Sequence, residues 1–230
     1  MSPTVFAAVT HVGLVRTNNE DAWGTGDELW VVADGMGGHA GGEIASRLAV
    51  DTLLDAAPAD PDAFRLAFAA AHRAVVDAST GGLAGMGTTL VAAAREAGGD
   101  VVLGSVGDSR GYLWDGGSLS RLTTDDNEAE VLLAEGSITA EEARTHPGQF
   151  YLTASLGSWR AQAPEPHLLR VPAHAGRLLL CTDGLNGELD DAAIAAGLAG
   201  GSAQEAAERL ADAAVDAGGR DNVTVLVVDL

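Results

Sequence analysis

The chain has 230 residues, which is enough to bury a substantial core in one large domain or two small ones. Its 33 acidic and 13 basic residues give a net charge of −20, and such a surface repels nucleic acid and anionic lipid because both bind through Lys and Arg. With one cysteine, no signal peptide and no run approaching the roughly 18 apolar residues of a membrane helix, we expect a soluble cytoplasmic protein without disulfides.

The first part of the sequence predicts strands and then two helices. The expected strands cover residues 5–9, 22–24 and 29–33. A glycine-rich turn over 35–42 leads into a helix over 43–57, where apolar residues recur at helical spacing. A second helix begins at Asp60-Pro61, because Asp caps helices and Pro suits their first turn, and it ends near residue 81.

The rest of the chain predicts hairpins, a polar segment, and a return to strands and helices. Hairpin strands are expected over 88–94, 100–106, 110–114 and 118–122. Residues 123–149 have the weakest strand signal, with helices over 127–135 and 139–145, and we interpret this segment as a mobile flap over the functional site. Later strands are expected over 150–154, 165–171, 177–182 and 223–228, with helices over 189–198 and 202–217. Hairpins combined with paired helices favour a single α+β layered domain over residues 1–230.

Three aspartates lie at strand ends, each beside a hydrophobic run: Asp34, Asp183 and Asp221. A strand end fixes a side chain at the rim of a sheet, so the three could converge. Converging carboxylates repel one another unless cations lie between them, and Mg²⁺ and Mn²⁺ prefer oxygen ligands. For any single Asp-Gly pair a plain turn is the better interpretation, as at Asp115-Gly116. The set as a whole predicts a metal-dependent hydrolase.

Residues near the first of these aspartates offer further chemistry. Arg16 could grip a phosphate with its planar fork of donors, and Glu20 or Asp21 could hold a metal or its water. The glycines after Asp34 would let the backbone approach a ligand closely. The same stretch resembles a dinucleotide fingerprint, but the βαβ context is missing and Asp34 would repel a pyrophosphate.

Two other motifs are interpreted as structural. Gly107-Asp108-Ser109-Arg110 lies between two expected strands and is interpreted as a tight hairpin that shapes the core. The Gly-x-Ser-x-Gly pattern of a serine nucleophile is absent. Cys181 lacks the Arg six residues later that a cysteine phosphatase loop needs, so it is expected to be a small core residue.

The motifs in chain order resemble those of the metal-dependent type 2C protein serine/threonine phosphatases, and most of all the compact bacterial members. The resemblance covers essentially the whole chain. It is carried by Arg16, Asn19-Glu20-Asp21, Asp34-Gly35-Met36-Gly37-Gly38-His39, Met86-Gly87-Thr88-Thr89, Gly107-Asp108-Ser109-Arg110, Leu122-Thr123-Thr124-Asp125, His146-Pro147, Leu156-Gly157, Thr182-Asp183-Gly184-Leu185 and Gly219-Arg220-Asp221-Asn222-Val223-Thr224.

This resemblance implies a four-layer α-β-β-α sandwich of two mostly antiparallel sheets, with two Mn²⁺ or Mg²⁺ ions between the sheet edges. It implies that Asp34 bridges both metals, that the Gly35 carbonyl binds one, and that other acidic residues complete the shell. These are Asp183 and Asp221 as ligands, Asp21 and Glu20 as holders of metal-bound water, and Asp125 together with Asp183 at a weaker third metal.

The implied activity is hydrolysis of phosphoserine and phosphothreonine by a hydroxide held between the metals, with Arg16 clamping the phosphate and His39 as a candidate proton donor. The implied partners are phosphorylated proteins made by Ser/Thr kinases, and we expect a monomer. Two stretches depart from the usual pattern, 124–127 and 152–155, and both concern substrate preference and the third metal. The alternative is a catalytically silent binding module with the same fold, which the retained acidic residues disfavour.

Overall fold

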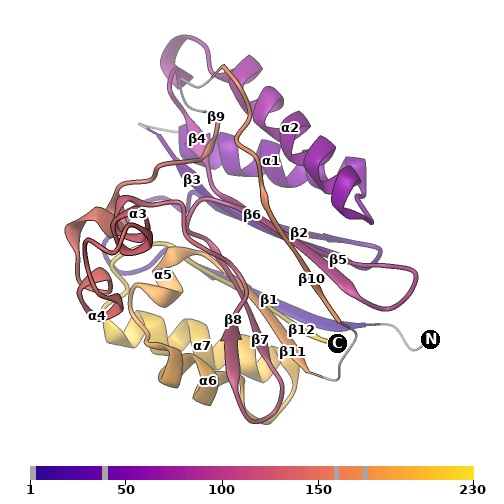
Figure 1. Cartoon of the computed structure of the whole chain (residues 1–230), viewed down its shortest axis with the longest axis vertical. Coiled ribbons are helices and arrows are strands. Elements are labelled where there is room, and N and C mark those ends of the chain that lie inside the picture. The colour runs from indigo at the N-terminus through magenta and orange to yellow at the C-terminus, as the bar shows by residue number, and fades with distance from the viewer. Residues whose placement is uncertain (1–3, 38–40, 158–160, 173–175) are drawn as a thin grey trace.

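The computed structural model describes the chain apart from residues 1–3, 38–40, 158–160 and 173–175. Two antiparallel sheets lie face to face, and a pair of helices covers the outer face of each (Figure 1). The expected four-layer α-β-β-α sandwich is therefore confirmed. The two sheets matter for function because the candidate site draws residues from both of them.

The first sheet has five strands in the order β1-β12-β11-β7-β8. Its strands are β1 (Val5–His11), β7 (Arg110–Trp114), β8 (Leu119–Arg121), β11 (Arg177–Cys181) and β12 (Val223–Asp229). Strand β12 is an interior strand, since it pairs with β1 on one side and β11 on the other. The outer face is covered by α6 (Asp191–Leu198) and α7 (Ala203–Ala217) (Figure 1).

The second sheet has seven strands, in the order β10-β6-β5-β3-β4-β9 with β2 paired to β3. Its strands are β2 (Asp21–Gly26), β3 (Leu29–Met36), β4 (Gly87–Thr88), β5 (Leu90–Arg95), β6 (Val101–Val106), β9 (Leu156–Gly157) and β10 (His167–Val171). Helices α1 (Gly41–Ala56) and α2 (Pro61–Ala78) cover its outer face (Figure 1). The expected strand over 88–94 is divided at Thr89, between β4 and β5.

Three apolar layers follow from the two-residue period of the strands. In β3, Val31 packs toward α1 and α2, whereas Val32 packs between the sheets. In β12, Val225 packs toward the outer helices and Leu226 packs between the sheets. Because both strands are buried on both faces, they appear in the sequence as continuous hydrophobic runs.

Helix boundaries are set by side-chain caps. Asp60 accepts a hydrogen bond from the Ala63 backbone N–H at the start of α2, with Pro61 in the first turn, as expected. Ser202 and Glu205 form a reciprocal capping box at the start of α7. Among the helices in the described ranges, none is both long enough and apolar enough to cross a membrane.

The segment predicted as a flap contains short helical elements at one end of the sandwich (Figure 1). They are α3 (Glu128–Ala134), α4 (Ala140–Ala143) and the 3-10 turn η2 (Pro147–Phe150). Thr139 caps α4 as expected. The expected strand over 150–154 is wrong: apart from one isolated bridge, Leu152 to Asn127, these residues pair with no strand. Two short connections complete the described elements, η1 (Gly81–Leu83) and α5 (Asp183–Asn186).

Candidate metal centre

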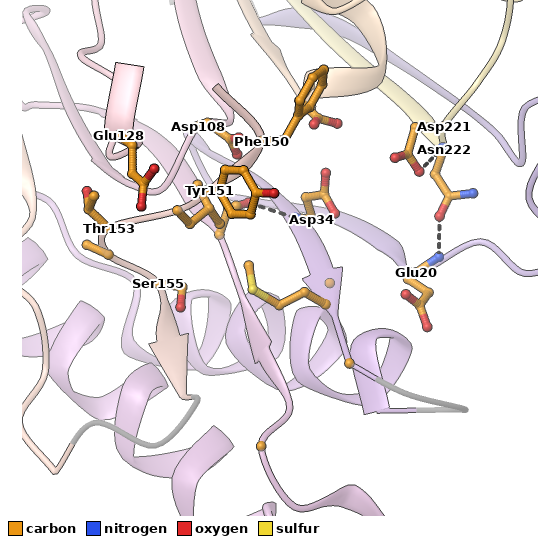
Figure 2. Close-up of a pocket in the computed structure, with 18 of the residues that line it drawn as sticks. Glu20, Asp34, Asp108, Glu128, Phe150, Tyr151, Thr153, Ser155, Asp221 and Asn222 are labelled. Carbon is orange, nitrogen blue, oxygen red and sulfur yellow. Dashed lines mark hydrogen bonds between the residues drawn. The ribbon is translucent and has the colours of Figure 1, made fainter. Parts of the chain in front are cut away.

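A cavity of about 650 Å³ opens where strand ends of both sheets meet, beneath residues 150–155 (Figure 2). Its described lining contains six carboxylates, Glu20, Asp34, Asp108, Glu128, Asp183 and Asp221, but only one cationic side chain, Arg16. A cavity of this charge repels a phosphate group by itself. It suits divalent cations, which would reverse the local field.

Asp34 is held at the carboxyl end of β3 by its own backbone. Its N–H donates to the Thr89 hydroxyl at 2.9 Å, and its carbonyl accepts from the Thr88 hydroxyl at 2.8 Å. Both threonines are buried, and the break between β4 and β5 brings them beside β3. The backbone is therefore fixed, and the carboxylate is left at the base of the cavity (Figure 2).

Asp183 and Asp221 reach the same cavity from the other sheet. Asp183 lies two residues past β11 as the first residue of α5, and Asp221 lies two residues before β12. The neighbouring Asn222 holds the loop before β12 in place, because its side-chain N–H groups donate to the Val12 and Asn18 carbonyls at 2.9 Å. Asp34, Asp183 and Asp221 all line this one cavity, and their binding of metal stays a prediction.

The electrostatics of the cluster are those of crowded anions. Burial and then repulsion from Asp21, Asp183, Asp108 and Asp221 raise the pKa of Asp34 well above its ordinary value. Burial, and then the charge of Asp221, raises the pKa of Asp183 to about 6. These carboxylates favour a proton or a cation in their midst.

Asp21 lies opposite Asp34 on the paired strand β2. Its Oδ2 accepts from the hydroxyls of Thr224 at 2.7 Å and Thr182 at 2.9 Å. Burial is the main reason that its pKa rises to about 7. Two carboxylates facing each other across a strand pair destabilise the sheet unless a positive charge offsets them.

The donor set fits divalent metal ions. Asp21 Oδ1 and Asp183 Oδ1 are buried and accept no hydrogen bond from the described residues. Buried carboxylate oxygens of this kind require a partner, and hard cations supply one. As the side chains stand, no three His, Cys, Asp or Glu residues within the described ranges close around a single point. The cluster is therefore open, and ions would be bound by carboxylates drawn inward against their mutual repulsion.

Arg16 offsets part of this charge. Its guanidinium donates to Asp221 Oδ2 at 2.6 Å, and both side chains are partly exposed. The hydrogen bond with Asp221 is the main reason that the pKa of Arg16 is raised. Arg16 therefore lies at the mouth of the cavity, where a phosphate bound next to the aspartates would meet it.

The other predicted site residues are placed as follows. Glu20 lines the cavity, and its backbone N–H donates to the Asn222 side-chain oxygen at 2.8 Å (Figure 2). Gly35 also lines it, and its N–H donates to the Glu20 carbonyl at 3.1 Å. His39 lies outside the described residues, so its role as a proton donor stays a prediction.

Asp125 is not brought into this cavity. Its carboxylate is buried between two arginines, with Arg110 Nη2 and Arg121 Nη2 each 2.7 Å from its oxygens. It lines a separate cavity of about 260 Å³ under α3 and α4. Because two guanidinium groups already compensate its charge, Asp125 is poorly suited to hold a cation. The expectation that it shares a third metal with Asp183 finds no support in this geometry.

Asp108 is the residue that the sequence interpretation missed. The tight hairpin predicted at Gly107-Asp108-Ser109-Arg110 is wrong, because β6 and β7 belong to different sheets and this motif connects them. Ser109 is nevertheless buried, and its hydroxyl bonds to that of Thr89 at 2.7 Å. Asp108, however, points into the cavity, and burial followed by the charges of Asp183 and Asp125 raises its pKa well above the ordinary value (Figure 2). Asp108 lies just past the end of β6, so the strand-end rule applied to the other aspartates would have found it.

These pKa shifts predict how stability depends on pH. Asp21 and Asp183 have an ordinary value of 3.8 and folded values of about 7 and about 6, so the folded state binds more protons than the unfolded state between these limits. The melting temperature of the metal-free protein should therefore fall as pH rises from about 4 to about 7. Mn²⁺ competes with those protons, so its stabilising shift should be larger at about pH 8 than at about pH 5. Melting curves with and without Mn²⁺ test this, and a shift that shrinks with rising pH would contradict it.

The four-layer α-β-β-α sandwich, with carboxylates from both sheets in one cavity, is the architecture of a metal-binding domain. Comparison with known proteins identifies the family. The sequence profile of protein phosphatase 2C matches residues 15–216. The chain belongs to this family.

Named relatives agree with this assignment. The chain is 42% identical over 233 residues to the serine/threonine protein phosphatase PstP of Mycobacterium tuberculosis strain H37Rv, covering 98% of this chain and 45% of the relative. It is 36% identical to the serine/threonine phosphatase stp of Listeria welshimeri, covering 96% and 93%. The crystal structure of the catalytic domain of PstP in complex with two manganese ions matches with a TM-score of 0.87 and 38% identity, over 98% of this chain and 97% of that one. The chain thus spans about half the length of the mycobacterial relative.

Proposed function

We propose that this chain is a metal-dependent protein phosphatase that hydrolyses phosphoserine and phosphothreonine. The observation that carries the proposal is the convergence of Asp34, Asp108, Asp183 and Asp221 in one cavity, with Arg16 at its mouth. The relatives named as serine/threonine phosphatases support the same reaction. The silent binding module is disfavoured, because a module that only docks a partner has no use for a cluster of mutually repelling carboxylates.

Two Mn²⁺ or Mg²⁺ ions are proposed as cofactors, in line with the two manganese ions of the PstP structure. Asp34, Asp183, Asp221 and the Gly35 carbonyl would hold them, with Asp21 and Glu20 completing the acidic surroundings. When bound, such ions supply an activated water at neutral pH and positive charge for the phosphoryl oxygens. We assign any third ion to Asp108 and Asp183, because Asp108 lines the same cavity as Asp183, whereas Asp125 lines a separate one.

The chain's own groups then position the substrate. Arg16 would exchange its bond to Asp221 for bonds to the phosphate, and these bonds would orient the ester for attack by water. A covalent phosphoenzyme is not expected. Cys181 is fully buried, and burial raises its pKa to about 12, so it offers no thiolate at neutral pH. His39 stays the candidate for protonating the leaving alkoxide.

One assay tests the proposal. A phosphothreonine peptide is expected to release phosphate in the presence of Mn²⁺, to stop doing so after EDTA, and to resume when Mn²⁺ is restored. A chain that binds Mn²⁺, as shown by a melting shift, yet releases no phosphate from phosphoserine, phosphothreonine or phosphotyrosine peptides would instead be the silent module.

Removing the guanidinium at the mouth should weaken substrate binding. Arg16→Ala is expected to raise KM for a phosphopeptide about tenfold, because a charge-assisted hydrogen bond is worth about 1.5–3 kcal/mol. Arg170→Ala is the matched control: its side chain is 55% exposed against 54% for Arg16, and it too pairs with one carboxylate, Glu96. An equal change in KM for both variants would contradict this role of Arg16 and would mean that another group binds the phosphate.

Residues 1–230 are proposed to act as one catalytic domain, with 123–149 as a flap beside the cavity. The flap contributes Glu128 to the lining, and the following residues 150–155 contribute the rest of that wall. The proposed substrates are phosphoproteins made by Ser/Thr kinases. The proposed setting is the cytoplasm, where the only cysteine would stay reduced, and the proposed state is a monomer.

A further inference from the structure

Two adjacent aromatic side chains stand exposed at the rim of the acidic cavity. Phe150 is 74% exposed and Tyr151 is 61% exposed, and both line the cavity (Figure 2). Single exposed apolar residues are common on protein surfaces. A neighbouring pair that lines a charged cavity is different, because it exposes a large apolar area where a substrate must approach.

The exposure does not come from a loose backbone. The Tyr151 carbonyl accepts from the Glu128 N–H at 3.0 Å, and the Thr153 N–H donates to the Asp126 carbonyl at 2.8 Å. The Tyr151 N–H also donates to the Gly148 carbonyl at 3.2 Å. The segment is tied to the start of α3, so the two rings are presented in a fixed place and little entropy is lost when a ligand covers them.

Glu128 adds a charge to this rim. It is exposed, it lines the cavity, and its backbone bond to Tyr151 fixes it beside the aromatic pair (Figure 2). The four aspartates at the base would be offset by two divalent ions. Glu128 at the rim would not be offset by these ions, so a peptide lying across the mouth meets negative charge beside the aromatic pair.

We propose that Phe150, Tyr151 and Glu128 form a docking ledge that selects the residues flanking the phosphorylated Ser or Thr. The inference rests on the proposed function and names its substrate class. The ledge favours a protein segment with an apolar side chain against the two rings and an Arg or Lys beside Glu128. Aromatic faces attract such cations as well as apolar groups. Acidic neighbours are disfavoured, which the net charge of −20 reinforces.

The experiment measures kcat/KM with Mn²⁺ on four phosphothreonine peptides that differ only in their flanking residues: glycines, Leu with Arg, Leu with Glu, and Gly with Arg. The Leu-Arg peptide is expected to exceed the Leu-Glu peptide about tenfold. Glu128→Gln should reduce that ratio about threefold, as for a partly exposed ion pair. Phe150→Ala combined with Tyr151→Ala should lower kcat/KM on the Leu-Arg peptide about tenfold, through lost apolar burial, and leave the glycine-flanked peptide nearly unchanged.

Two matched controls separate the ledge from general effects. Glu130→Gln removes the same charge from the same first turn of α3, but Glu130 faces Arg121 in the other cavity. Leu66→Ala removes an apolar side chain that is also 74% exposed, on α2. Both controls should keep the wild-type ranking of the peptides. Hydrolysis of all four peptides at equal rates, or the same ranking in the ledge variants, would overturn the ledge. Hydrolysis of none would instead overturn the proposed function.

Discussion

Asp183→Asn is expected to abolish Mn²⁺-dependent hydrolysis of a phosphopeptide while leaving the chain folded. Asp183 is buried among Asp34, Asp108 and Asp221, so an amide in its place removes one negative charge from the cluster that would hold the ions. Loss of metal-supplied charge stabilisation should lower kcat/KM by about three orders of magnitude or more. The same result is expected for Asp34→Asn.

A second measurement separates this effect from misfolding. Without metal, Asp183→Asn should raise the melting temperature, because the substitution relieves repulsion in a crowded cluster. The stabilisation by Mn²⁺ should shrink in the same variant. Asp115→Asn is the control, since Asp115 is an Asp-Gly turn residue that bonds only within its own turn. Full activity in Asp183→Asn would refute the site.

The largest expected effect on stability comes from Gly35→Ala. A Cβ at this position would lie 2.0 Å from the Gly42 carbonyl oxygen and 2.5 Å from that of Glu20, both backbone atoms that cannot swing aside. The start of α1 and the strand that carries Asp34 would have to separate. We expect a loss of about 3 kcal/mol or more in the free energy of unfolding, together with loss of Mn²⁺ binding.

Urea unfolding with Gly82→Ala as the control checks this prediction. Gly82 has no atom within 4 Å of a built Cβ, so alanine there should change stability by less than about 1 kcal/mol. Equal stability of Gly35→Ala and the wild type would mean that β3 and α1 are not packed as described.

Much of the fold could be predicted from the sequence, because local patterns determined it. The double-sided burial of β3 and β12 produces unbroken hydrophobic runs, and Asp60, Thr139 and Ser202 stand where helices begin. The strand-end rule found Asp34, Asp183 and Asp221. Each of these signals lies within a few residues of the feature that it predicts.

The errors arose where distant residues decide the outcome. Residues 150–154 have a β-like composition, but their partners are backbone groups near 126–128, which prevent a ladder. Asp125 was implied as a metal ligand by the family resemblance, yet its carboxylate pairs with Arg110 on β7 and with Arg121, four residues before it. Asp108 was missed because its motif was interpreted as a tight hairpin, whereas β6 and β7 belong to different sheets and the connection between them reaches the cavity.

Because the cavity is built from two sheets, its dimensions depend on the apolar layer that separates these sheets. Asp34 is carried by one sheet, Asp183 and Asp221 lie at strand ends of the other, and Asp108 lies in the connection from β6 to β7 that joins them. Trp30, Val32, Leu178, Leu180 and Leu226 fill the space between the sheets. That apolar filling works as a spacer for the carboxylates. Replacing these apolar side chains by smaller ones would let the two sheets slide or move closer together. The spacing of the bound ions, and with it the rate of turnover, would then depend on residues that never contact the substrate.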